Sequence, residues 1–372
     1  MKNPDEYKLI QEMMSDNAKQ ESLYTAGNYW KFYEKNILKQ IKNNDLKYFR
    51  SWPGGSGSGN IQSFGGGEHE LSSEYLRNFH PFDHKFEKLD NNILVKKYNG
   101  LINKISKLFP FFSFFSIRSS EGRKYFFRLM KEKQNYLYEL ISTLDKSLVE
   151  ISDSEFGNPI GFYKSKKFYT TKFLEELLHI HFIKKNCDIY SMNSVTELGP
   201  GIGLMASGLL KLNKNLKYLL VDIPPILFFS EYFLKNLGFK VFGYREMKKS
   251  KKLDLNVIFK DFQVCVLPPW KLNLLNNFKT DLFINVESFQ EMEKEQSQNY
   301  LRLFQNSAEY IYLDNAIHGH KKIKKKDSFG VINSTTKADL EKTIFQYFEV
   351  VDQKIYNKNV RFKALYKKII SN

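Results

Sequence analysis

The segment 195–203, VTELGPGIG, limits what this chain can fold into more than any other. It reads as an apolar strand that ends in a glycine-rich turn, and the apolar residues from Leu204 onward continue it as a helix. Glycines in such a turn leave room for a ligand to approach the backbone at the carboxyl edge of a sheet. Asp222 ends the next predicted strand, where its carboxylate can accept hydrogen bonds from both hydroxyls of a ribose. The pattern predicts an α/β fold with a nucleoside site.

Short apolar runs after Asn193 alternate with helix-length amphipathic segments, which is typical of parallel strands covered by helices. The predicted strands are 194–198, 218–222, 263–267, 281–286 and 310–314. Two β-rich runs, 348–356 and 361–369, flank the turn-like cluster NKN and predict an antiparallel hairpin. The expected sheet is therefore parallel and ends in an antiparallel hairpin.

The N-terminal part of the chain reads as helices. A helix is predicted around 29–41, with one buried face formed by four residues at near-helical spacing: Trp30, Tyr33, Ile37 and Ile41. The segment 51–67 holds seven of the 20 glycines and is expected to be a loop. We expect a mainly helical region at 1–150, which contains this loop, and an α/β domain at 151–372.

The formal charge of +16 raises the question of an anionic partner. Only eight of the 57 basic residues are Arg, although the planar guanidinium is the group that nucleic-acid readers use most. We therefore expect no nucleic-acid partner. The longest apolar stretch, 108–117, contains Pro110 and is about half the length of a spanning helix, so at most peripheral membrane contact is expected.

Cysteine usage and the first residues of the chain predict its location. Cys187 and Cys265 are the only cysteines, too few for a disulfide framework. The first residues mix charged and apolar side chains and do not resemble a secretory signal. The expected location is the cytoplasm, including the inner face of the cytoplasmic membrane.

Glu197 separates this glycine turn from that of the dinucleotide dehydrogenases, because it precedes the turn by two positions and no glycine stands at the third dehydrogenase position. The turn with its acidic lead-in resembles motif I of the class I S-adenosylmethionine-dependent methyltransferases. Further segments are similar to the sugar O-methyltransferases of bacterial surface-polysaccharide gene clusters: VDIPP, VLPPW, INVESFQEM and, upstream, NYWKFY and FGNP. This similarity spans most of the chain, and the long, lysine-rich stretch 240–262 departs from it.

The resemblance implies a Rossmann-like class I methyltransferase sheet that binds S-adenosylmethionine and releases S-adenosylhomocysteine. By the same resemblance, Glu197 and the glycine turn face the methionine portion, Asp222 the ribose and Ile223 the adenine. The implied cofactor-binding residues are Glu197, Gly199, Pro200, Gly201, Gly203, Asp222, Ile223, Leu267, Pro268 and Asn285.

Methyl transfer to a hydroxyl needs a base that accepts the proton. Three candidates stand near the predicted strand ends: Glu287, Glu291 and His318. His318 is slightly favoured, because an imidazole titrates near neutrality. Other roles stay open: Glu291 as a cap of the following helix, Glu287 as a residue that orients cofactor or substrate, and His318 as an exposed loop residue. A divalent metal is compatible with these side chains, but no spacing indicates one.

The expected function is S-adenosylmethionine-dependent O-methylation of a sugar hydroxyl in surface polysaccharide or glycoconjugate biosynthesis. The acceptor would be a sugar, a sugar nucleotide or a glycan, covered by the helical N-terminal region. Of three tryptophans that can stack on a sugar, Trp52 is preferred over Trp30 and Trp270, because it lies beside the glycine-rich segment. The alternatives are a methyltransferase of nucleic acid or a small molecule, and a non-catalytic cofactor-binding scaffold. The oligomeric state stays open.

Overall fold

The structure is a computed structural model. It describes residues 3–51, 120–159, 161–250, 252–274, 278–320, 322–323 and 330–369. Three expectations fall outside these residues: the glycine-rich loop from residue 52 onward, Trp52 and the apolar stretch 108–117.

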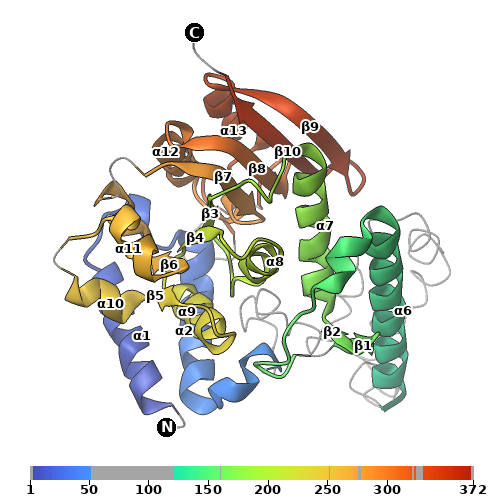
Figure 1. The fold of residues 1–372 in the computed structure, drawn as a ribbon. Helices are drawn as coiled ribbons and strands as arrows, with labels where there is room; N and C mark the ends of the chain where they lie inside the picture. The colour runs from blue at the N-terminus through green and yellow to red at the C-terminus, as the bar shows by residue number, and fades with distance from the viewer. Residues whose placement is uncertain are drawn as a thin grey trace.

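An eight-stranded sheet organises the C-terminal half of the chain (Figure 1). Its strands are β3 (Ser194–Leu198), β4 (Lys217–Val221), β5 (Val241–Phe242), β6 (Val264–Leu267), β7 (Thr280–Val286), β8 (Ala308–Ala316), β9 (Phe348–Tyr356) and β10 (Arg361–Lys368). The spatial order is β5-β6-β4-β3-β7-β8-β10-β9; the first six strands are parallel, and β10 runs antiparallel to β8 and β9. A parallel sheet closed by an antiparallel hairpin is the Rossmann-like class I methyltransferase sheet, and the predicted fold class is confirmed.

Three short strands were not predicted. β5 has only two residues, which is too short for an alternating pattern. β1 (Phe162–Lys164) and β2 (Lys167–Tyr169) form a separate hairpin whose turn residues, Ser165 and Lys166, both have positive φ. Such a turn usually carries Gly or Asn, so the sequence offers no turn signal here.

Helices flank the sheet and supply the N-terminal region. Their bounds are α1 (Pro4–Asn17), α2 (Asn28–Asn43), α6 (Ser120–Leu144), α7 (Thr171–Asn186), α8 (Leu204–Leu212), α9 (Ile226–Asn236), α10 (Tyr244–Lys249), α11 (Leu255–Asp261), α12 (Lys294–Gln305) and α13 (Lys337–Ile344). The chain steps one way from β3 through α8 to β4, and the other way from β7 through α12 to β8. Right-handed crossovers therefore place α8 and α12 on opposite faces. No described helix is long and apolar enough to cross a bilayer.

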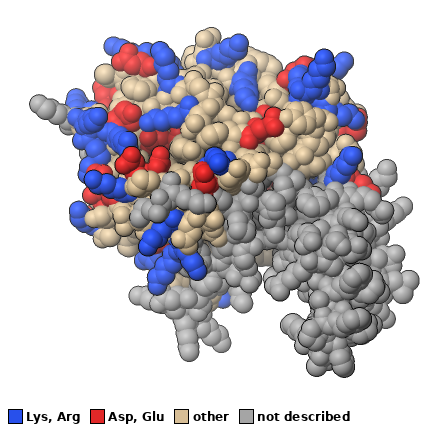
Figure 2. Space-filling view, turned by 90° about the horizontal axis from the view of Figure 1, so that it is seen from below, with Lys and Arg blue, Asp and Glu red and all other residues tan. Residues whose placement is uncertain are grey.

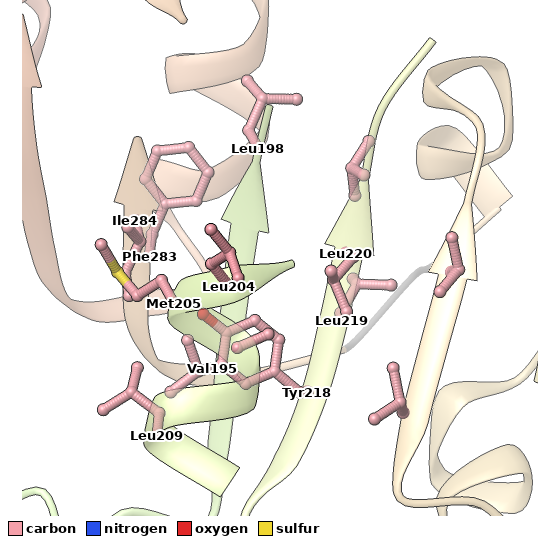
Figure 3. Packing of buried hydrophobic residues seen from close by; sticks show 14 of the residues in the cluster. Val195, Leu198, Leu204, Met205, Leu209, Tyr218, Leu219, Leu220, Phe283 and Ile284 are labelled. Atoms are coloured by element: carbon pink, nitrogen blue, oxygen red, sulfur yellow. The ribbon is translucent and has the colours of Figure 1, made fainter. Parts of the chain in front are cut away.

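One hydrophobic core connects the helices with the sheet. Figure 3 shows buried side chains of β3, β4, β7 and α8 in this core, among them Val195, Leu220, Phe283 and Met205. The same core includes Ile41 of α2, as predicted for that helix face. The core is thus continuous across residue 150, and the division into 1–150 and 151–372 stays a prediction.

A buried ion pair also joins the N-terminal region to the rest of the chain. Arg50 is fully buried, and its Nη2 lies 2.6 Å from Oδ2 of Asp153. The guanidinium donates a further hydrogen bond to the carbonyl of Ser154, and the hydroxyl of Thr170 donates to the Asp153 carboxylate. Each charge is therefore compensated inside the protein.

Candidate active site

The glycines of the turn after β3 adopt backbone conformations that other residues rarely adopt. Gly199, Gly201 and Gly203 have φ values of 73°, 58° and 85°, in the left-handed region that side chains disfavour. A Cβ at Gly199 would lie 2.1 Å from Oγ of Ser288, in the segment that follows β7. The ends of β3 and β7 are therefore packed together without space for a side chain, and Gly203 directly precedes α8.

A cavity lies at the carboxyl edge of β3 and β4, with a volume of about 400 Å³ that includes space open to solvent. It is lined by the ends of β3 and β4, the residue Pro269 after β6, the segment between β7 and α12, Gln296 and Tyr300 of α12, and the N-terminal segment 25–30. Gly199, Asp222 and Ile223 are in this lining, so the structure brings these three predicted residues together.

Asp222 lines the cavity and is only 9% exposed. Its Oδ1 accepts a hydrogen bond of 2.8 Å from the backbone N–H of Ile223. Burial raises the pKa of this carboxyl to about 8, although backbone hydrogen bonds from Ile223 and Gly201 act in the opposite direction. Asp222 therefore holds a proton at neutral pH until a ligand stabilises the carboxylate.

Glu197 lies beneath the glycine turn and does not contribute to the cavity lining. Its Oε2 accepts a hydrogen bond of 2.8 Å from the hydroxyl of Tyr218. Burial, followed by the nearby charge of Glu176 on α7, raises the pKa of Glu197 to about 8. Two protonatable carboxyls thus stand at the carboxyl ends of neighbouring strands: Glu197 one residue before the end of β3, and Asp222 directly after β4.

Glu291 connects the cavity to the N-terminal region. It ends the short helix η8 (Phe289–Glu291), lines the cavity, and accepts hydrogen bonds from the side chains of Tyr29 and Trp30. Burial, and then the charge of Glu287, raises its pKa to about 8. The alternative role of Glu291 as a helix cap is wrong, because α12 begins after Glu293, which forms the capping box.

The N-terminal segment is anchored at the cavity by α12. Nε2 of Gln296 donates to the carbonyls of Ser22 and Thr25, at 2.7 and 2.9 Å. Trp30 then contributes to the lining from the start of α2. Of the two tryptophans within the described residues, Trp30 lines the cavity and Trp270 does not, and no local pattern distinguishes Trp30 in advance.

Glu287 follows β7 with a left-handed backbone, φ 62°, and a side chain that is 48% exposed. Its Oε1 lies 3.0 Å from Nη1 of Arg361, and Lys172 is 3.8 Å from Oε2. The Arg361 guanidinium lowers the pKa of Glu287 to about 2. This carboxylate is therefore ionised at neutral pH and suits the orientation of a donor group better than the acceptance of a proton.

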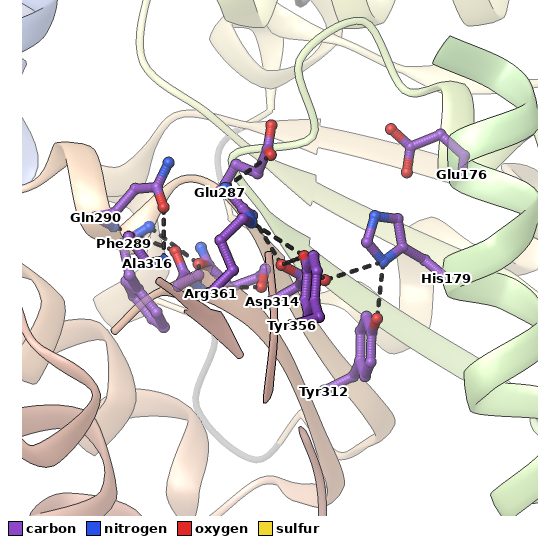
Figure 4. Close-up of polar contacts among 12 residues, drawn as sticks. Glu176, His179, Glu287, Phe289, Gln290, Tyr312, Asp314, Ala316, Tyr356 and Arg361 are labelled. Atoms are coloured by element: carbon purple, nitrogen blue, oxygen red, sulfur yellow. Dashed lines mark hydrogen bonds and ion pairs between the residues drawn. The ribbon is translucent and has the colours of Figure 1, made fainter. Parts of the chain in front are cut away.

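Behind Glu287 lies a polar network between α7, β8 and the terminal hairpin (Figure 4). The carboxylate of Asp314 accepts hydrogen bonds from Arg361 at 2.7 Å and from the hydroxyl of Tyr356 at 2.6 Å. Nδ1 of His179 lies 3.5 Å from Asp314 and 2.8 Å from the hydroxyl of Tyr312. Burial lowers the pKa of His179. The network holds Arg361, and through it Glu287, in place.

The other predicted residues do not line the cavity. His318 is exposed in the turn after β8. Asn285 is fully buried; its Nδ2 donates to the carbonyl of Leu198, and its Oδ1 accepts from the backbone N–H of Phe289. Asn285 thus ties the ends of β3 and β7 together. The remaining members of the set are Leu267, Pro268, Pro200, Gly201 and Gly203, and the role of each stays a prediction.

Two further observations concern the distribution of surface charge and the presence of metal ligands. Figure 2 shows Lys and Arg side chains interspersed with Asp and Glu over the described part of that face, without a continuous basic stripe. Within the described residues, no group of three or more His, Cys, Asp or Glu side chains is arranged to hold a metal ion.

No family model matches the sequence, and no curated protein matches it. Several solved structures are similar to part of the chain. A magnesium protoporphyrin IX methyltransferase from Synechocystis, with bound S-adenosylhomocysteine, is 12% identical; the match covers 53% of this chain and 83% of that one, with a TM-score of 0.37. A S-adenosylmethionine-dependent methyltransferase from Clostridium acetobutylicum is 14% identical, with 50% and 89% covered and a TM-score of 0.35.

The pyocyanin biosynthetic protein PhzM is 10% identical, with a TM-score of 0.35; the match covers 54% of this chain and 58% of PhzM, less than two thirds of its length. At these identities and TM-scores, the similarities identify neither a family nor a substrate for this chain.

Proposed function

We propose that this chain is a S-adenosylmethionine-dependent methyltransferase that methylates a sugar hydroxyl. The observation that supports the methyltransferase assignment is that Gly199, Asp222 and Ile223 line one cavity at the carboxyl edge of the class I methyltransferase sheet. Motif I and the acid at the end of the next strand predict this arrangement from the sequence. A nucleoside cofactor is the ligand that such an edge accommodates.

The cavity fits the cofactor on two counts. Gly199 has no side chain and lines the cavity, so its backbone borders the space for a ligand, and Ser288 packs where a Cβ would lie. One oxygen of Asp222 is held by Ile223, and hydroxyl donors of a ribose supply the hydrogen bonds that favour its ionised form. When bound, the cofactor supplies an electrophilic sulfonium methyl for in-line displacement.

The chain's own residues then have to orient the acceptor and take its proton. We place Glu291 first among the three candidate bases, because it lines the cavity. Its pKa of about 8 leaves a minor ionised fraction at neutral pH, and this fraction is a stronger base than an ordinary carboxylate. Glu287 is ionised and half exposed, and we assign it to hydrogen bonding with acceptor hydroxyls. His318 becomes the third candidate, since it is exposed and outside the lining.

Calorimetric titration with S-adenosylhomocysteine tests the cofactor site. Wild type should bind at micromolar concentration, and Asp222→Ala should bind at least tenfold more weakly, a loss of about 1.4 kcal/mol. Glu309→Gln, a change at an exposed carboxylate on β8, is the control and should bind like wild type. A folded wild type that does not bind refutes the methyltransferase assignment.

The acceptor is tested by transfer of a labelled methyl group to sugar nucleotides, free sugars and lipid-linked glycans. Turnover with a sugar that is lost in Glu291→Gln, while S-adenosylhomocysteine still binds, supports both the acceptor class and the base. Binding of the cofactor without transfer to any sugar, combined with transfer to another acceptor, refutes the sugar assignment and leaves the cofactor site intact.

A further inference from the structure

The two edges of the sheet differ in length. β5 at one edge has two residues, whereas β9 at the other has nine. An edge strand presents unpaired backbone N–H and C=O groups, and proteins usually keep such edges short or covered. Figure 1 shows β9 on the outside of the fold, and no described strand lies beyond it. A long open edge of this kind is suited to the addition of another strand.

Exposed apolar side chains are frequent in the C-terminal segment that contains β9. Fourteen large hydrophobic side chains are exposed in the described part of the chain, and seven of them lie between residues 345 and 369. Three belong to β9 itself: Val350, Val351 and Ile355, with exposures of 41%, 40% and 48%. The other four are Phe345, Tyr347, Val360 and Ile369. Exposed apolar side chains on a long open edge strand are typical of an interaction site.

Two opposite charges on β9 make its edge complementary to itself. The carboxylate of Asp352 is positioned from the end of α7, by Nδ2 of Asn186 at 3.0 Å and Nζ of Lys185 at 3.7 Å. Lys354 is exposed and forms no ion pair with the described residues. Since the two side chains are two positions apart on a strand, they lie on the same face.

One antiparallel register uses both charges and the three exposed apolar side chains of β9. When two copies of β9 are related by a twofold axis at Gln353, Lys354 of each copy faces Asp352 of the other. The same register sets Ile355 against the irregularity at Val350 and Val351, where β9 has an extra residue relative to β10. Opposite charges and apolar side chains that face each other across strands stabilise pairing.

We propose that β9 is a dimer interface, at which it pairs antiparallel with β9 of a second copy and joins the two sheets across a twofold axis. Self-complementary charge in a twofold register favours a second copy over a different partner, because an isologous contact requires each surface to match itself. The interface does not depend on the proposed activity, since β9 contributes no residue to the cavity lining.

Sedimentation velocity of the full chain tests the charges. Lys354→Asp leaves two acidic side chains on each edge and Asp352→Lys leaves two basic ones, so each variant alone should dimerise at least tenfold more weakly than wild type. An equimolar mixture of the two restores both opposite-charge pairs and should dimerise nearly as well as wild type. Lys358→Asp, at the hairpin turn outside the register, is the matched control for the charge change and should dimerise normally.

Hydrogen exchange measured by mass spectrometry locates the contact. The amides of residues 350–355 should exchange more slowly as the protein concentration rises. Circular dichroism and thermal unfolding confirm that each variant is folded. The proposal is overturned by a wild type that is monomeric at every concentration, by a dimer whose β9 amides gain no protection, or by a mixture of folded variants that associates no better than each alone.

Discussion

Replacement of Asp222 by Asn should stabilise the cofactor-free protein and abolish cofactor binding. The carboxyl is 9% exposed, and burial raises its pKa from 3.8 to about 8. Asn has nearly the same shape, keeps the oxygen that accepts from Ile223, and carries no ionisable group. The substitution therefore removes the free-energy cost of burying this acid.

The sign and size of the stability difference between wild type and Asp222→Asn follow from proton linkage. Between about pH 4 and pH 8 the unfolded chain has lost this proton and the folded chain retains it, so the stability of wild type falls as the pH rises. The expected slope is about 1.4 kcal/mol per pH unit relative to Asp222→Asn, which amounts to a few kcal/mol by neutral pH. Above about pH 8 the difference should become constant, because both states are then ionised.

Urea unfolding of the cofactor-free protein over this pH range measures the difference, with Glu309→Gln as the control for removal of one surface charge. Affinity of wild type for S-adenosylhomocysteine should rise with pH up to about pH 8, since the ribose hydroxyls need the ionised carboxylate. A stability difference that does not vary with pH, or an Asp222→Asn variant that binds like wild type, would refute this reasoning.

Three further substitutions test packing and polar contacts. Arg50→Leu should lower the free energy of unfolding by about 3–5 kcal/mol, because it leaves the Asp153 carboxylate buried without its partner; addition of Asp153→Leu should recover much of this loss in urea unfolding. Gly199→Ala should prevent binding of S-adenosylhomocysteine in calorimetry, because the new Cβ meets Oγ of Ser288, and Gly199→Ala combined with Ser288→Gly should recover part of the affinity. Asn285→Ala should cost about 1–3 kcal/mol in thermal or urea unfolding, since it leaves two buried backbone groups without a partner; a loss below the error of the measurement contradicts the tethering role.

The predicted sheet agrees closely with the structure. β3 has the predicted bounds, and the terminal hairpin is 348–356 with 361–368, against a prediction of 348–356 and 361–369. The stretch 240–262, which departs from the resembling family, contains β5, α10 and α11. Its short elements carry too few residues for periodicity to define them.

Only those parts of the candidate site that a local sequence pattern specifies could be predicted. The glycine turn and Asp222 were found because a strand, a tight turn and a helix are specified by neighbouring residues. The ranking of the three candidate bases could not be predicted from the sequence. It depends on the contact of Arg361 with Glu287 and on the hydrogen bonds of Tyr29 and Trp30 to Glu291.

The sequence by itself determined the α/β class, the parallel strands and the closing hairpin, and it predicted the edge at which we propose that a nucleoside binds. Only the tertiary structure decided which side chains surround that edge, because the N-terminal segment 25–30 and the segment between β7 and α12 are far apart in the chain. It also decided which carboxyls are protonated at neutral pH. Burial and neighbouring charge set a pKa, and neither is a property of a residue and its sequence neighbours alone.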